Sequence, residues 1–327
     1  MPHRLALPTS EPPLTGPIPR HRPPARLLLL AAAPPALLGL SGCLGAPPAE
    51  VAAGDQTGDP AARSGPVLAV GGGGTPRSVV RLGLERAPGG PDQVRVAVVP
   101  FASSREGRGV GSVEMWLEEG AMEAALVPED RSARGILEAA DVIWLGGGSQ
   151  HQLMDTLERL DLVEVIRERH RAGALVGGTS AGAAVLGGVL ISGSPDPDAY
   201  LRGAVPTRRA LDLVPGVLVD QHFRERNREG RLLTAVIDGG GEWLGVGISE
   251  STAALFQGRS LEVAGEGVVL VFDARRATVA PAEPGAPRSA SGVLVSVHPP
   301  GERVPLAPTS GEPGEPVSSA PWPSSPR

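Results

Sequence analysis

A short glycine-rich motif around Ser180 is the strongest chemical signal in the sequence. Residues 178–182 read Gly-Thr-Ser-Ala-Gly and follow an apolar run at 174–177. A serine hydroxyl becomes an effective nucleophile when it projects from a sharp strand-to-helix turn, and small flanking residues allow the close backbone packing that this turn needs. The motif therefore predicts a nucleophile elbow, with the N–H of Ala181 facing a developing oxyanion. A glycine-rich turn with a helix-capping serine is the alternative.

A nucleophilic serine needs a general base, and the setting of His222 suits that role. His222 follows an apolar run at 217–219 after two polar residues and would face the elbow from the end of a strand. His151 is a rival, because it follows the glycine-rich turn after another predicted strand. The sequence favours His222 as the base, and it favours solvated surface positions for His170 and His298.

The third member of a catalytic triad is an acid that orients the imidazole. Between the serine and the histidine, the candidates are Asp196 and Asp198, both in a predicted loop. The turn at 146–150 follows a strand and has exposed backbone N–H groups, so we expect Gly148 to be the second oxyanion donor. Together with the serine and histidine, these residues complete a predicted serine hydrolase site.

Four arginines follow His222 at short spacing and form a candidate binding element. They are Arg224, Arg226, Arg228 and Arg231. On a predicted helix, Arg224, Arg228 and Arg231 share one face, whereas Arg226 points elsewhere. Guanidinium groups form bidentate hydrogen bonds with carboxylates, so the cluster suits a substrate that carries acidic groups. A solvated helix whose arginines are balanced by neighbouring glutamates is the alternative.

Composition excludes several other chemistries. The 30 residues counted as Lys or Arg are all Arg, and a chain without Lys cannot be a P-loop NTPase, a pyridoxal phosphate enzyme or a Ser-Lys hydrolase. A formal net charge of -6 gives no basic surface for nucleic acid. The run Gly71–Gly74 is followed by Pro76, which breaks the dinucleotide-binding pattern, so we interpret it as a strand-end turn. The expected chemistry needs no metal and no cofactor.

A sheet must position these residues, and the sequence predicts one. Short β-branched runs alternate with helical stretches, which indicates a doubly wound α/β fold with a mostly parallel sheet and helices on both faces. The predicted strands are 67–70, 94–99, 142–145, 174–177 and 217–219, and the predicted helices are 110–120, 132–140, 152–171, 181–186 and 224–237. Runs at 268–272 and 293–297 predict a β-rich C-terminal segment. Ligands bind at the carboxyl ends of strands in such folds.

The N-terminal region has the features of a lipoprotein export signal. Arg20, Arg22 and Arg26 precede an apolar run at 27–40, which is too short for a transmembrane helix and leads through Ser and Gly to Cys43. We therefore expect a signal peptide (1–42), a lipidated Cys43 with a flexible linker (43–64), a catalytic domain (65–307) and a disordered Pro/Ser-rich tail (308–327). This organisation predicts an exported, membrane-anchored lipoprotein at the cell surface or in the periplasm.

Three motifs resemble those of the cyanophycinase and dipeptidase E group of serine peptidases, which share a glutamine-amidotransferase-like fold. They are the serine motif at 178–183, Gly147-Gly148-Ser149-Gln150, and Asp220-Gln221-His222-Phe223 followed by Arg226, Arg228, Arg231 and Leu232. The resemblance covers roughly residues 66–307. The long motif that begins at Asp220 is the specific one, because many hydrolases share the serine motif.

The resemblance implies a peptidase that cleaves at aspartyl residues of cyanophycin, a branched Asp-Arg polymer, or of other Asp-rich peptides. It implies Ser180 as the nucleophile, His222 as the base, and Asp198 where the family has a glutamate. The implied substrate-binding residues are Gln150, Asp220, Gln221, Arg226, Arg228 and Arg231. An anchor at Cys43 implies action outside the cytoplasm, and a homodimer is compatible with the resemblance. An α/β-hydrolase esterase and a non-catalytic surface binding lipoprotein are the alternatives.

Overall fold

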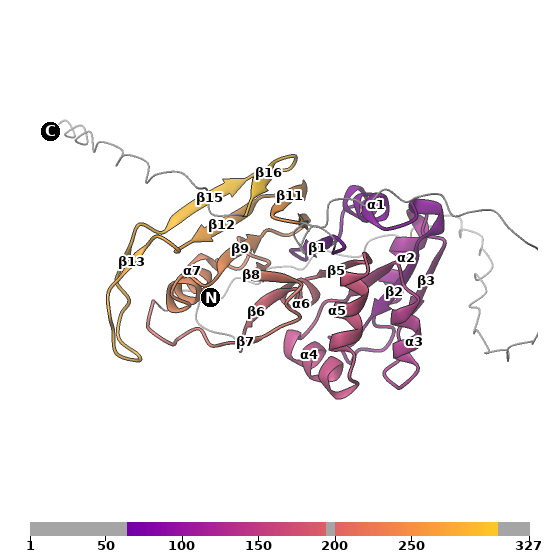
Figure 1. Ribbon diagram of the computed structural model, residues 1–327, viewed down its shortest axis with the longest axis horizontal. Coiled ribbons are helices and arrows are strands. Elements are labelled where there is room, and N and C mark those ends of the chain that lie inside the picture. The colour runs from indigo at the N-terminus through magenta and orange to yellow at the C-terminus, as the bar shows by residue number, and fades with distance from the viewer. Residues whose placement is uncertain (1–63, 194–199, 307–327) are drawn as a thin grey trace, which may run out of the picture. The chain divides into compact units, whose positions relative to one another are not determined.

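The computed structural model describes residues 64–193 and 200–306 (Figure 1). The predicted signal peptide, Cys43, most of the linker and the C-terminal tail lie outside these residues. So do the two acidic candidates of the predicted triad, Asp196 and Asp198. Within the described residues, no helix combines the length and the apolar character that crossing a membrane requires.

The larger sheet has eight strands, and its central part is parallel. The order is β16-β11-β10-β1-β5-β4-β2-β3. The parallel strands are β1 (Val67–Val70), β5 (Leu175–Thr179), β4 (Val142–Leu145), β2 (Arg95–Val99) and β3 (Glu123–Leu126). The antiparallel strands are β10 (Thr252–Gln257), β11 (Ser260–Gly265) and β16 (Arg303–Pro305). Strands β10, β11 and β16 therefore extend this sheet on one side, whereas the C-terminal runs predicted at 268–272 and 293–297 belong to the second sheet.

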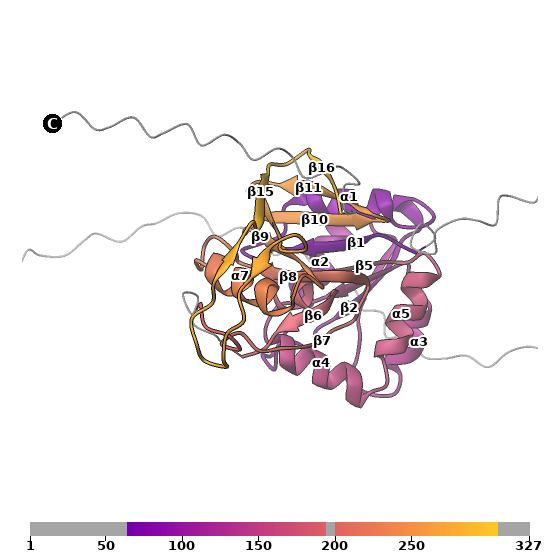
Figure 2. The ribbon, with the colours of Figure 1, turned by 60° about the vertical axis from the view of Figure 1, so that its left-hand side comes forward.

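Helices cover both faces of this sheet (Figures 1 and 2). Alternate residues of β1 point to opposite faces: Leu68 packs with α1 (Arg77–Arg86) and α2 (Val110–Glu118), while Ala69 belongs to the cluster with the other helices. The helices of this second cluster are α3 (Ala133–Glu138), α4 (Gln150–Arg159) and α5 (Val163–Arg171). A short 3₁₀ helix, η2 (Pro91–Gln93), precedes β2. A sheet buried on both faces requires continuous apolar strands, and β1 and β4 are buried throughout.

A second sheet of six strands lies beside the first, in the order β15-β12-β9-β8-β6-β7. Its parallel strands are β6 (Gly187–Ile191), β8 (Val214–Gln221) and β9 (Leu244–Ile248), and its antiparallel strands are β7 (Thr207–Arg209), β12 (Val269–Asp273) and β15 (Leu294–His298). Helix α7 (Glu229–Asp238) packs its Leu232 on one face of this sheet. A two-stranded ribbon, β13 (Thr278–Val279) and β14 (Ala290–Ser291), and the short helix α6 (Ala181–Ala184) complete the elements.

The doubly wound α/β class is confirmed, and three details differ from the sequence prediction. The predicted helix 152–171 is two helices, because the chain leaves the helical conformation at Asp161, where φ is 55°. The predicted helix 224–237 begins only at Glu229, because Asn227 has a φ of 49° and residues 222–228 form turns. The separate sheet around β8 was not predicted, because its strands β6, β7 and β9 are short and rich in glycine or arginine.

The structure also corrects the prediction for His170, which is buried and not solvated. Its exposed fraction is 7%, and its Nε2 lies 2.8 Å from the carbonyl oxygen of Gly65. Burial lowers the pKa of the His170 imidazole, although the bond to Gly65 opposes this and the Arg171 charge adds to it. His170 thus ties the first residue of the predicted catalytic domain to helix α5.

We predict that this histidine makes stability depend on pH. Because the pKa of His170 is lower in the folded chain, the unfolded chain takes up the proton first as pH falls, so the free energy of unfolding decreases below about pH 6.5. Urea unfolding of wild type and His170→Gln at about pH 7.5 and about pH 5.5 measures this. The variant should lose less stability on acidification, and an identical loss would contradict the assignment.

Candidate active site

Ser180 sits on the turn between β5 and α6, at the carboxyl end of the parallel strands. Its φ of 54° and ψ of −115° are unusual for a side-chain-bearing residue and push the hydroxyl out of the turn. The turn is possible because Gly182 approaches β4 closely: a Cβ at that position would lie 2.1 Å from the carbonyl oxygen of Leu145. The glycine-rich motif therefore folds into the strand-to-helix elbow that the sequence predicts.

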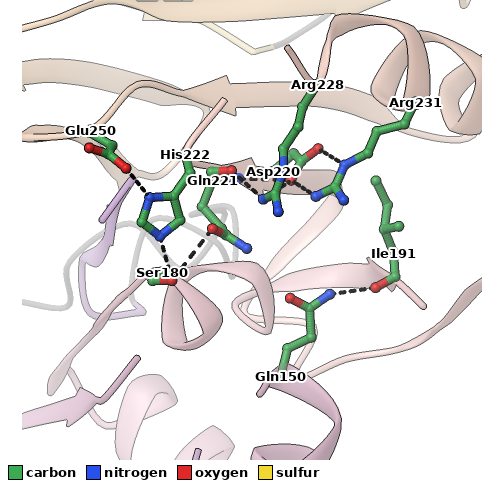
Figure 3. Close-up of polar contacts among 9 residues, drawn as sticks. All are labelled: Gln150, Ser180, Ile191, Asp220, Gln221, His222, Arg228, Arg231 and Glu250. Carbon is green, nitrogen blue, oxygen red and sulfur yellow. Dashed lines mark hydrogen bonds and ion pairs between the residues drawn. The ribbon is translucent and has the colours of Figure 1, made fainter. Parts of the chain in front are cut away.

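A chain of hydrogen bonds links Ser180 to an imidazole and a carboxylate (Figure 3). Ser180 Oγ lies 2.8 Å from His222 Nε2, and His222 Nδ1 lies 2.5 Å from Glu250 Oε1. His222 comes from the end of β8 with only 10% of its side chain exposed, and Glu250 follows β9. The serine hydroxyl can donate to Nε2 while Nδ1–H donates to the carboxylate, which is the arrangement of a Ser-His-acid triad.

Glu250 is the functional candidate that sequence reasoning missed. The sequence prediction looked for the acid between Ser180 and His222, whereas Glu250 follows both of them in the chain. The available signal was the apolar run 244–248, a strand that Ser and Glu follow directly. Because β9 lies directly beside β8, with Ile248 opposite Gln221, the residues that follow the two strands meet. The backbone N–H of Glu250 also donates to the carboxylate of Glu225 at 3.0 Å.

His151, the rival base, lies elsewhere in the structure. Its Nε2 accepts a hydrogen bond from the backbone N–H of Gly193 at 3.0 Å. That contact uses the ring nitrogen to hold the loop after β6, and the imidazole that contacts Ser180 is that of His222. The structure therefore brings together the serine and histidine that the sequence favours.

The run of four glycines after β1 lies directly against His222 and Glu250. The carbonyl of Gly71 accepts the backbone N–H of His222 at 2.7 Å. A Cβ on Gly72, whose φ is 94°, would lie 2.3 Å from Cε1 of His222, and a Cβ on Gly73 would lie 2.5 Å from Oε2 of Glu250. The strand-end turn predicted from the sequence is thus a surface on which the imidazole lies directly against the backbone.

We predict that Gly72→Ala displaces the imidazole and lowers kcat at least about 100-fold, since a misplacement of about 1 Å can cost that much. Gly74→Ala is the matched control, because Gly74 also has a positive φ of 120° but its Cβ would meet nothing within 4 Å. Both variants carry similar backbone strain, so only Gly72→Ala should change kcat strongly and shift the pH profile of kcat/KM. Equal effects of the two substitutions would contradict the role of Gly72.

The two expected oxyanion donors belong to segments next to Ser180. The N–H of Ala181 begins α6, and Gly148 lies in the turn after β4 with a φ of 143°. Neither N–H has a hydrogen-bond partner within residues 64–193 and 200–306. Gly147 of the same turn lies against the serine, since a Cβ there would be 3.4 Å from Ser180 Cβ. The turn after β4 and the first residue of α6 therefore both lie next to the serine, as the prediction of two oxyanion donors requires.

The structure changes the roles expected for Asp220 and Arg231, which were predicted to line the substrate pocket. Both are buried, with exposed fractions of 2% and 6%. Arg231 binds Asp220 through two hydrogen bonds, with Nε 2.7 Å from Oδ2 and Nη2 2.5 Å from Oδ1 (Figure 3). Asp220 also accepts the backbone N–H of Gln221 at 2.9 Å. This ion pair fixes α7 to the end of β8, directly beside His222, and its charges are used within the protein.

Arg228 and Arg226 differ in their availability. Arg228 donates to the carbonyl of Gln221 at 2.5 Å and lies 3.3 Å from Asp220 Oδ1. Burial lowers the pKa of Arg228 to about 10, and the charges of Arg231 and Arg226 act in the same direction, whereas Asp220 opposes them. Arg226 is exposed, and no carboxylate or carbonyl among the described residues pairs with its side chain. Arg226, like Arg224, is therefore exposed and available to contact a substrate, and of the two it is Arg226 whose charge acts on Arg228.

The two predicted glutamines lie at the edges of the site. Gln221 is buried, and its Oε1 is 3.5 Å from Ser180 Oγ. Gln150 is the first residue of α4, and Ser149 caps this helix by accepting the N–H of Gln152. The Nε2 of Gln150 donates to the carbonyl of Ile191 at 2.5 Å (Figure 3). Gln221 thus faces the nucleophile, while Gln150 joins α4 to the end of β6.

Metal ligation has no candidate in the part of the chain that the structure describes. Across those residues, no group of three or more His, Cys, Asp or Glu side chains could hold a metal ion. The site is built from a hydroxyl, an imidazole, a carboxylate and backbone N–H groups, and these suffice for acyl transfer.

Comparison with known proteins identifies relatives of the chain. Residues 67–264 match the sequence profile described as Peptidase family S51. A cyanophycinase from Trichormus variabilis is 36% identical over 208 residues, which are 60% of this chain and 68% of that protein. A peptidase E from Actinobacillus pleuropneumoniae serotype 7 is 29% identical over 174 residues, which are 53% of this chain and 72% of that protein.

A solved structure shares the fold. The crystal structure of a peptidase from an acI-B1 Actinobacterium aligns with a TM-score of 0.50 at 20% sequence identity, covering 75% of this chain and 98% of that one. The family profile spans most of both sheets, including β1, β5, β8 and β9, the four strands around the hydrogen-bonded serine. The chain belongs to peptidase family S51 and is a serine-type peptidase.

Proposed function

We propose that this peptidase cleaves peptide bonds at aspartyl residues of Asp-rich peptides or cyanophycin, through an acyl-enzyme on Ser180. The observation that carries the proposal is the hydrogen-bond chain from Ser180 through His222 to Glu250. The relatives named cyanophycinase support the substrate class. An exposed arginine beside the site supports it independently, because guanidinium groups bind carboxylates.

The proposed mechanism has two acyl-transfer steps. Ser180 Oγ attacks the peptide carbonyl while its proton passes to His222 Nε2, and Glu250 stabilises the imidazolium through Nδ1–H. The N–H groups of Ala181 and Gly148 hold the oxyanion. His222 then returns the proton to the leaving amine, and the C–N bond breaks to leave an ester on Ser180. Water, deprotonated by the same imidazole, attacks this ester; the bond between the acyl carbon and Ser180 Oγ breaks, His222 returns the proton to Ser180 Oγ, and the acid is released.

Substrate selection is proposed to depend on which arginines are free. Asp220 binds Arg231 and also contacts Arg228, so both guanidinium groups already have a partner within the protein, although the three side chains together keep one net positive charge. Arg226 is exposed, and its charge is close enough to lower the pKa of Arg228. A substrate carboxylate beside Arg226 would relieve this repulsion between like charges. The arrangement favours a substrate with one carboxylate near the scissile bond.

The substrate proposal can be tested with matched peptides. The purified protein is incubated with cyanophycin and with a panel of short peptides in which one Asp is kept or replaced by Asn. We expect cleavage at Asp with a kcat/KM at least about tenfold above that for Asn, the ratio that about 1.4 kcal/mol of preferential binding gives. Equal cleavage of the Asp and Asn peptides would contradict aspartyl specificity and leave the serine mechanism standing.

Replacing Arg226 by alanine should affect acidic substrates selectively. We expect kcat/KM for Asp peptides to fall about 10-fold to 100-fold, as the loss of a hydrogen bond between charged groups predicts, while hydrolysis of a neutral activated ester stays within about twofold. Arg224→Ala is the matched control, because Arg224 is also exposed but does not perturb the pKa of Arg228. Equal losses on the acidic peptide and on the ester would exclude a carboxylate-binding role.

The order of the triad residues argues against the esterase alternative. In α/β-hydrolases the nucleophile is followed by the acid and then by the histidine. Here the acid that contacts the imidazole follows it, giving the order Ser180, His222, Glu250. The non-catalytic alternative predicts an incomplete site, whereas all three side chains are present and hydrogen-bonded. The order of the triad residues and the completeness of the site therefore both support the proposal of a peptidase over the two alternatives.

We also propose that the peptidase is exported and anchored by a lipid on Cys43. The support is the sequence before the domain: basic residues, a short apolar run and small residues leading to the only cysteine. An anchored enzyme of this kind would act on polymer or peptides outside the cytoplasm. Metabolic labelling with a radioactive fatty acid tests this, and equal labelling of wild type and Cys43→Ser would contradict it.

A further inference from the structure

A second Ser-His-Glu hydrogen-bond chain lies on β15 and the turn that follows it. Ser296 Oγ is 2.8 Å from His298 Nε2, and His298 Nδ1 is 2.8 Å from Glu302 Oε2. The contacts use the same atoms in the same order as those of Ser180, His222 and Glu250. This second chain is outside residues 67–264, the range that the family profile matches. His298, predicted from the sequence to be a solvated surface residue, is instead partly buried and hydrogen-bonded on both ring nitrogens.

The local backbone explains why these three side chains meet. Ser296 and His298 are two residues apart in a strand, so both point to one face of the second sheet, opposite Val271 and Val269 of β12. Glu302 closes the turn after the strand, where its N–H bonds to the carbonyl of Pro299. Its own carbonyl accepts the N–H of Val263 at 2.9 Å, which fixes the turn to the larger sheet.

The burial of the three groups suits a reactive hydroxyl. The His298 side chain is 15% exposed, so its ring is held in place, while the Glu302 side chain is 50% exposed. Ser296 is half-buried, so part of the residue remains open to solvent. A serine hydroxyl donating to a neutral imidazole is activated by that base, and a carboxylate on the other nitrogen stabilises the imidazolium that forms.

We propose that Ser296 is a second nucleophilic serine, which takes up phosphonyl or acyl groups from electrophiles with good leaving groups. With a phosphonofluoridate, Ser296 Oγ forms a bond to phosphorus, the P–F bond breaks and fluoride leaves. The hydroxyl proton passes to His298 Nε2, and Glu302 faces the resulting imidazolium. The proposal ends at the covalent adduct and makes Ser296 a modification site, not a second peptidase centre. It does not depend on the role proposed for Ser180.

The test removes the first serine and measures reaction at the second. The full chain carrying Ser180→Ala is treated with a fluorophosphonate, and adducts are mapped by mass spectrometry over time. Ser260 is the internal control, because it is also a half-buried strand serine but its hydroxyl donates to the carbonyl of Gln257 at 3.2 Å. We expect Ser296 to react at least about tenfold faster than Ser260, which is less than the roughly 10²-fold effect of a general base in an enclosed site because this site is open to water.

A second variant separates activation from exposure. His298→Gln in the same background keeps a hydrogen-bonding side chain but removes the base, and the Ser296 rate should fall about tenfold or more, to the rate of Ser260. The rate at Ser260 and the thermal unfolding midpoint should not change, which shows that β15 remains folded. Reaction at Ser296 no faster than at Ser260, or an unchanged Ser296 rate in His298→Gln, would overturn the proposal.

Discussion

Ser180→Ala is expected to lower kcat for peptide hydrolysis by about 10⁶-fold, the size of effect that removal of a triad nucleophile has in other serine peptidases. The substitution removes the atom that forms the acyl-enzyme, and neither His222 nor Glu250 can replace it. The positive φ at position 180 strains serine and alanine equally, so the free energy of unfolding should change by less than about 1 kcal/mol. Steady-state peptide hydrolysis and a thermal unfolding curve measure the two effects.

The thermal curve is the control that makes this result interpretable. Ser180 sits on a short turn between β5 and α6. If the variant unfolds at the wild-type temperature, this turn is intact, and the loss of activity results from the missing hydroxyl. Activity within about tenfold of wild type, a loss far below the one expected for a nucleophile, would contradict a covalent role for this hydroxyl. Adventitious peptidase is excluded by requiring the same result in independent preparations.

Glu250→Gln is expected to lower kcat by about 10³-fold to 10⁴-fold with little change in KM, as replacing a triad acid by its amide does elsewhere. A glutamine amide can donate to Nδ1, which favours the tautomer whose Nε2 carries the proton and cannot accept one from Ser180. Glu225→Gln is the matched control, because Glu225 also lies beside the site but contacts only the backbone N–H of Glu250. We expect its effect to stay below about threefold.

The same experiment distinguishes Glu250 from the acid expected from the sequence. Asp198→Asn should leave kcat within about threefold, because the Nδ1 position of His222 is occupied by Glu250. A large loss in Asp198→Asn together with a small loss in Glu250→Gln would contradict the assignment of Glu250. It would instead support Asp198 as the triad acid.

The serine and the histidine could be predicted from the sequence because their signals are local. The elbow needs glycines next to Ser180, and Gly182 is required by the approach of its backbone to Leu145. His222 follows directly after a strand that is buried from Val217 onward. Each signal lies within a few residues of the side chain that it concerns, so no knowledge of the sheet order was needed.

Glu250 could not be predicted in the same way, because its contact depends on strand pairing. It meets His222 only because β9 pairs in parallel with β8, and no local pattern reports which strands are neighbours. The four glycines after β1 pose the same problem. Their sequence indicates a turn, and only the structure shows that the imidazole fills the space that a side chain on Gly72 would need.

The arginine cluster shows why residue type alone does not give a role. Arg231 and Arg226 belong to one motif, yet Asp220 binds the first within the protein and the second remains exposed. The predicted helical face of arginines does not form, because the chain turns at Asn227 before α7 begins. Which arginine is free depends on burial, and burial follows from the second sheet, which was not predicted.

The central claim, that Ser180 is the peptidase nucleophile, is tested most directly by titrating activity against modification of that hydroxyl. The active full-length protein is treated with increasing fluorophosphonate, and residual peptide hydrolysis is compared with the fraction of Ser180 that carries the adduct. We predict that activity falls in direct proportion to modified Ser180 and reaches zero when modification is complete. Full peptidase activity in protein whose Ser180 is entirely modified would contradict the claim.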